Sequence, residues 1–172
     1  YLDFADKNNI TLRIHGPISP QASRWAKADN RTKEELENNM IEYFTALCKR
    51  MNKEPSVKWM DVVNETITRQ GNWFEEKPGV TQWENPWEQI GRDENDVPLY
   101  ITKAFEISNK YAPNVSQVFN QHGGMEPKMW EKVKETILYL KSEGYRVDGL
   151  GWQAHLRSDV PLALDKKQLD YF

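Results

Sequence analysis

Apolar positions along the chain follow two alternating patterns. Short apolar runs, the first of them rich in β-branched residues, occupy residues 10–15, 57–64, 115–120 and 146–152. Between them lie longer stretches in which apolar residues recur three and four positions apart, the spacing of one helix face. Strands that alternate with helices are typical of βα units and a parallel sheet. The order fits half of an eight-stranded barrel or most of a small doubly wound sheet, and periodicity does not choose between them.

Capping and helix-breaking residues set the expected ends of the helices. Thr32 and Glu35 have the spacing of a capping box, in which each side chain satisfies the other residue's backbone N–H. Pro98 is placed near the start of the next helix and Pro113 at its end, while Gly144 is placed to terminate a third. The expected apolar face of the helix after Thr32 comprises Leu36, Met40, Tyr43, Leu47 and Met51.

A long connection separates the second and third expected strands. Residues 66–97 show no clear periodicity, and loops longer than about 12–15 residues in compact domains are often functional. Three of the seven tryptophans fall here, namely Trp73, Trp83 and Trp87. Exposed indole rings serve as stacking platforms for sugars, whereas buried ones fix a loop to its domain. The sequence supports both interpretations about equally.

Polar residues capable of chemistry stand at the ends of all four expected strands. These residues are His15, Asn64 with Glu65, Asn120, and Gln153 with His155. In (β/α)8 barrels the catalytic groups lie at the carboxyl ends of the strands, where they share one site. The distribution therefore favours a barrel with a site at that edge.

The pair Asn64-Glu65 is the strongest candidate for catalysis. Glycoside cleavage needs one carboxyl group as proton donor and a second as nucleophile or base, and an adjacent amide can hold a sugar hydroxyl. For the dipeptide alone, a strand that simply ends in solvated polar residues is the somewhat better explanation. The longer segment 59–65, Trp-Met-Asp-Val-Val-Asn-Glu, resembles the acid/base motif of glycoside hydrolase family 10, whose members are mainly endo-β-1,4-xylanases.

Further segments resemble the same family in the same order. They are residues 12–15, 87–91, 100–101, 104–105, 111–113 and 148–156. The resemblance covers essentially the whole chain. It implies that residues 1–172 are the central part of one catalytic domain, a partial (β/α)8 TIM barrel with about strands 3 to 6 and their helices.

The resemblance also implies roles for individual residues. Glu65 is expected to be the general acid/base, and His155 is expected to orient the nucleophile. The expected substrate-binding residues are His15, Trp25, Asn64, Asn120 and Gln153. The implied activity is retaining hydrolysis of a β-1,4-linked plant polysaccharide, above all xylan, without a cofactor. The family's nucleophilic glutamate is expected beyond Phe172, so the 172 residues alone are expected to be inactive.

Departures from the family pattern keep an alternative open. Ile14 stands where a tryptophan is usual, residues 16–21 differ, and Asn120-Gln121-His122 replaces a more usual Asn-Asp-Tyr. These differences suggest altered subsites, or a non-catalytic barrel that only binds carbohydrate. Retention of Glu65 favours the hydrolase. A related barrel family would share the Asn-Glu pair without Gln153-x-His155.

Composition narrows the possible partners. The net charge is −3 with both signs interspersed, so no basic stripe indicates a nucleic-acid partner. No apolar run approaches the roughly 18 residues of a membrane span. Cys48 is the only cysteine, which excludes a disulfide within the chain. A secreted or periplasmic location is implied by the resemblance alone, and the open sheet edges of a partial barrel predict self-association.

Overall fold

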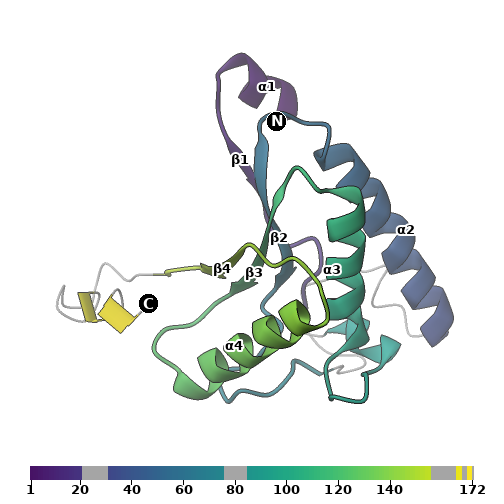
Figure 1. Cartoon of the computed structure of the whole chain (residues 1–172), viewed down its shortest axis with the longest axis vertical. Helices are drawn as coiled ribbons and strands as arrows, with labels where there is room; N and C mark the ends of the chain where they lie inside the picture. Colours follow the sequence, from purple (N-terminus) through teal and green to yellow (C-terminus); the bar gives the residue numbers. More distant parts are fainter. Residues whose placement is uncertain (21–30, 76–84, 156–165, 168–169, 172) are drawn as a thin grey trace.

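A four-stranded parallel sheet organises the molecule (Figure 1). The computed structural model describes residues 1–20, 31–75, 85–155, 166–167 and 170–171. The strands are β1 (Leu12–Ile14), β2 (Val57–Asn64), β3 (Ser116–Gln121) and β4 (Gly149–Trp152), and each pairs in parallel with the next in chain order. β1 and β4 form the two edges of this sheet.

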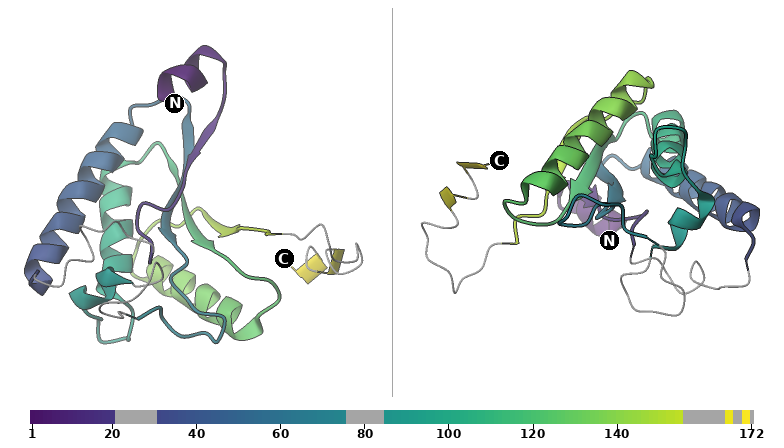
Figure 2. Two further views of the ribbon diagram at one scale, coloured as in Figure 1. Left: turned by 180° about the vertical axis from the view of Figure 1, so that it is seen from behind. Right: turned by 90° about the horizontal axis from the view of Figure 1, so that it is seen from below.

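Helices follow the strands in the order expected for βα units. The α-helices are α1 (Leu2–Lys7), α2 (Lys33–Met51), α3 (Leu99–Tyr111) and α4 (Pro127–Ser142), and a 3-10 helix, η2, spans Pro86–Ile90. Figure 2 shows α2, α3 and α4 succeeding one another along one side of the sheet. An uninterrupted strand order with these helices on one side is the arrangement of a (β/α)8 barrel, because a doubly wound sheet reverses its strand order. The predicted partial barrel is confirmed.

The predicted ends of the helices are confirmed, but one predicted helix face is partly wrong. Thr32 caps α2: its hydroxyl accepts from the Glu35 N–H at 3.1 Å, and the Glu35 carboxylate accepts from the Thr32 N–H at 2.8 Å. The buried residues of α2 are Leu36, Met40, Phe44, Cys48 and Met51. Tyr43 is 41% exposed, because the helix packs along the row of residues four apart and Phe44 occupies the core position.

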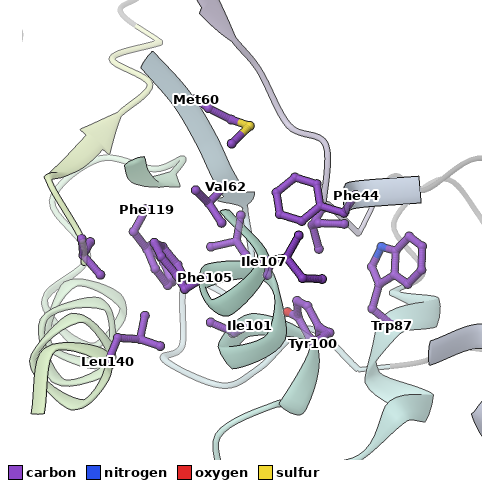
Figure 3. Packing of buried hydrophobic residues seen from close by; sticks show 14 of the residues in the cluster. Phe44, Met60, Val62, Trp87, Tyr100, Ile101, Phe105, Ile107, Phe119 and Leu140 are labelled. Carbon is purple, nitrogen blue, oxygen red and sulfur yellow. The ribbon is translucent and has the colours of Figure 1, made fainter. Parts of the chain in front are cut away.

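The core lies between the sheet and these helices (Figure 3). Side chains that alternate along a strand point to opposite faces, so Met60 and Val62 of β2 enter this core together. Phe105 of α3 stacks on Phe119 of β3 with ring centroids 6.4 Å apart and ring planes within 9°. The other face carries Trp59, 46% of which is exposed, and the polar groups described below.

Candidate active site

The carboxyl ends of β2, β3 and β4 lie together at one end of the sheet, here called the rim. Asn64 pairs with Asn120 across β2 and β3, and Gln121 pairs with Trp152 across β3 and β4. The backbone N–H of Gln153 donates to the Gln121 carbonyl at 3.1 Å, which extends the pairing one residue further. Parallel register therefore places the ends of three predicted strands side by side.

Glu65 occupies a strained and buried position at the rim. Its φ is +55°, in the left-handed region that is uncommon for residues with a side chain, and only 7% of the residue is exposed. Its backbone N–H donates to the Asn120 carbonyl at 3.1 Å. Oε1 accepts from Gln153 Nε2 at 2.7 Å, whereas Oε2 is buried and receives no hydrogen bond from the described residues. Strain of this kind is concentrated at functional sites, and Oε2 is the oxygen left for a proton or a ligand.

Asn64, Asn120, Gln153 and His155 surround this carboxyl group through a chain of hydrogen bonds. Asn64 Oδ1 accepts from Asn120 Nδ2 at 2.7 Å and from Gln153 Nε2 at 2.9 Å. Gln153 Oε1 lies 2.7 Å from His155 Nε2. The structure thus brings together five of the site residues expected from the sequence.

The predicted position of His15 at the rim is wrong. β1 pairs Ile14 with Met60, which sets His15 level with Asp61, three residues before Asn64. The chain continues beside β2 after His15, and the carbonyl of Ile18 accepts from the Asn64 N–H at 2.9 Å. Ser19 is the residue of that segment that reaches the rim, with its Oγ 3.5 Å from Asn64 Nδ2.

His15 instead lines an open hollow of about 350 Å³ on the concave side of the sheet, beneath the rim. Its Nδ1 lies 2.8 Å from Asp61 Oδ2. Gln153 and His155 line the same hollow, so a part in substrate binding stays a prediction for His15. Trp25, the remaining candidate, lies outside the described residues.

The two described tryptophans of the long loop fix it to the barrel. Trp73 is 4% exposed and donates from Nε1 to the Asp96 carbonyl at 2.8 Å. Trp87 is 2% exposed and donates from Nε1 to the Ser19 carbonyl at 3.2 Å. Neither ring presents a face for stacking, and Trp83 lies outside the described residues. Trp87 therefore supports the rim indirectly, by holding Ser19.

His122 is a rim residue that the strand-end argument passed over, because it follows the last paired residue of β3. Its ring lies 6.3 Å from that of Phe74, and its Nδ1 is 3.3 Å from Gln121 Nε2. Burial lowers the pKa of His122. Of the charged groups around it, Glu65 and Glu126 oppose this effect, and Arg69 and His155 reinforce it. His122 is therefore a neutral side chain at neutral pH.

We expect His122 to make stability fall as the solution becomes acidic. Its folded pKa lies below its ordinary value of 6.5, so below that pH the folded state binds fewer protons than the unfolded chain. Melting temperatures of wild type and His122→Gln, measured at pH 7 and pH 5, should show the larger drop in wild type. An equal drop in both proteins would contradict a buried neutral imidazole.

The described residues show neither a metal site nor a membrane-spanning helix. No group of three or more His, Cys, Asp or Glu side chains among them is arranged to hold a metal ion. No helix within the described ranges is both long and apolar enough to cross a bilayer.

The fold and the rim together define half of a (β/α)8 barrel with a buried carboxyl group among amides at its carboxyl edge. The chain belongs to glycosyl hydrolase family 10, whose family model matches residues 1–171. It is 31% identical over 158 residues to an endo-1,4-beta-xylanase A of Caldicellulosiruptor saccharolyticus, an alignment that covers 89% of this chain and 42% of that protein.

Solved structures give the same result. Native xylanase 10B from Thermotoga maritima superposes with a TM-score of 0.76 at 26% identity, over 99% of this chain and 49% of that one. Xylanase 10B from Thermotoga petrophila in complex with xylobiose superposes with a TM-score of 0.74 at 25% identity, over 98% and 48%. The chain therefore spans about half the length of these structures.

Proposed function

We propose that the protein carrying this sequence is a retaining glycoside hydrolase that cleaves β-1,4-linked xylan. In this proposal Glu65 is the general acid/base, and residues 1–172 belong to one catalytic barrel. The observation that carries it is the buried Glu65 carboxyl group, with one oxygen held by Gln153 and the other without a hydrogen-bond partner among the described residues. Membership of family 10 and similarity to xylanases support the choice of substrate.

The five predicted residues at the rim each have a part in this mechanism. Glu65 donates a proton to the glycosidic oxygen and later activates water, while a second carboxyl group about 5–5.5 Å away forms the glycosyl intermediate. The Nδ2 amide of Asn64 binds a hydroxyl of the sugar at the cleavage point. Gln153 holds Glu65, and His155, bonded to Gln153, orients the second carboxylate. Asn120 fixes Asn64, and Trp25 and His15 extend the substrate contacts.

The test is turnover of xylohexaose and cellohexaose by the complete catalytic barrel that contains residues 1–172, with the anomeric form of the first product followed by NMR. We expect xylooligosaccharide products that are released first as the β-anomer, and little cleavage of cellohexaose. Binding of xylohexaose without any cleavage would instead identify a non-catalytic carbohydrate-binding barrel. Release of the α-anomer first would exclude the retaining mechanism. A secreted or periplasmic location belongs to the same proposal.

A further inference from the structure

A row of polar side chains crosses the concave face of the sheet below the rim. Arg13 of β1, Asp61 of β2 and Asn120 of β3 are neighbours there. Asp61 is 1% exposed, and both of its oxygens are occupied: Oδ1 accepts from Arg13 Nε at 2.8 Å, and Oδ2 lies 2.8 Å from His15 Nδ1. A buried carboxylate with two such partners holds the Arg13 guanidinium in one place.

Arg13 can only donate hydrogen bonds, and this property fixes the orientation of its next neighbour. Its Nη2 donates to Asn120 Oδ1 at 3.0 Å. A primary amide has a donor end and an acceptor end. A row made only of amides can form the same hydrogen bonds with every amide reversed. A donor-only group at one end of the row removes that ambiguity. Asn120 must then turn Nδ2 towards Asn64 Oδ1, 2.7 Å away.

The same order of donor and acceptor ends continues along the row to Glu65. Asn64 Oδ1, once it faces inwards, attracts the donor end of Gln153, whose Nε2 lies 2.9 Å away. That Nε2 also donates to Glu65 Oε1 at 2.7 Å. In the reversed order, the carbonyl of Gln153 would face the Glu65 carboxylate, and two acceptors would meet. The reversed order would also turn the acceptor end of Asn64 outwards.

The backbone of β4 leaves space for the contact between Arg13 and Asn120. A Cβ added to Gly151 would lie 2.5 Å from Arg13 Nη2 and would overlap Asn120 Oδ1 as well. Real Cβ atoms essentially never approach other atoms this closely, so a side chain at position 151 would displace both groups. Arg13 and Asn120 thus occupy a space that exists only because residue 151 is glycine.

We propose that Arg13, held by Asp61, is a positioning residue that sets the orientation of all three rim amides. By doing so it presents the Gln153 N–H to Glu65 and the Asn64 N–H groups to the substrate. The assignment of a substrate contact rests on the proposed function, whereas the orientation of the amides does not. Neither Arg13 nor Asp61 reaches the reacting atoms in this scheme.

Arg13→Met tests the proposal because it keeps an unbranched apolar stem and removes every donor. We expect kcat on xylohexaose to fall about tenfold or more, with a much smaller change in KM. The reason is that the variant loses the charge-assisted hydrogen bond from Arg13 to Asn120, which orients the amides beside Glu65. Arg13→Lys keeps a donor-only cation and should lose less. The side-chain amide NMR signals of Asn64, Asn120 and Gln153 should shift and broaden in Arg13→Met even without substrate.

Arg146→Met is the matched control. Arg146 pairs with Asp148 at 3.1 Å and donates to the carbonyls of Pro113 and Val115, but it lies just before the amino end of β4, away from the rim. We expect a smaller loss of melting temperature than in Arg13→Met, because Asp148 is partly exposed and Asp61 is buried, with unchanged kcat and unchanged rim amide signals. Unaltered amide signals in Arg13→Met, or an Arg13→Lys variant as impaired as Arg13→Met, would overturn the proposal. Wild type that turns over no glycoside would overturn the proposed function alone, because the amide signals report on Arg13 independently.

Discussion

Replacing Glu65 with alanine is expected to slow cleavage of xylohexaose by roughly 10²–10⁴-fold, the usual contribution of a general acid/base. The sugar leaving group cannot depart without a proton, so bond cleavage depends fully on the Glu65 carboxyl group. A dinitrophenyl β-xyloside has a leaving group that departs unprotonated, so formation of its glycosyl intermediate should be slowed far less. The measurement is kcat/KM on both substrates, which reports this first step.

Two variants make the Glu65 result specific. Glu65→Gln keeps the size of the side chain and cannot act as an acid, so it should lose activity as Glu65→Ala does. Glu143→Ala removes an exposed carboxylate just after α4 and should leave both rates unchanged. An equal loss on the two substrates in Glu65→Ala would remove Glu65 from the role of proton donor.

Strand positions were predictable wherever apolar side chains alone define the strand. β2 matches the predicted range 57–64, because its run of apolar residues faces the helices on one side and the barrel interior on the other. β4 begins at Gly149, three residues later than predicted. The reason is Asp148, whose carboxylate accepts from the Gln117 N–H at 2.7 Å and takes the place of a backbone acceptor. A side chain that accepts a hydrogen bond in place of a strand's backbone carbonyl cannot be recognised from a pattern of apolar residues.

The site was predictable to the extent that it follows from strand ends. Asn64, Glu65 and Gln153 were found in this way, because the carboxyl ends of neighbouring parallel strands lie at the same end of the sheet. His15 was misplaced because β1 ends at Ile14, as the apolar pattern predicts, while the chain runs on beside β2 as far as Ile18. The register between β1 and β2 cannot be predicted from the sequence pattern.

Arg13 and Asp61 were missed for a different reason. Each is a charge that interrupts an apolar run, and the run itself does not show which residue pairs with it. A signal was nevertheless present: a charge buried in a sheet is costly unless an opposite charge lies beside it. Two such charges of opposite sign on strands expected to be neighbours predict an ion pair in the barrel interior, and the structure places Arg13 Nε 2.8 Å from Asp61 Oδ1.

Leu140→Ala should strongly destabilise the fold, and Leu138→Ala provides its control on the same helix. Leu140 is fully buried between α4 and the sheet (Figure 3). Leu138, two residues earlier, is 56% exposed. Removal of a buried leucine side chain costs about 2–5 kcal/mol, because apolar contact is lost and a cavity remains. A largely exposed leucine loses neither, so its truncation should change the free energy of unfolding by about 0.5 kcal/mol or less. Urea unfolding of both variants measures the difference in their free energies of unfolding. Helix propensity cannot cause this difference, because both variants replace leucine by alanine within the same helix. Equal destabilisation would mean that α4 does not pack on the sheet through Leu140, and the register that brings β4 and Gln153 to the rim would lose its support from that helix.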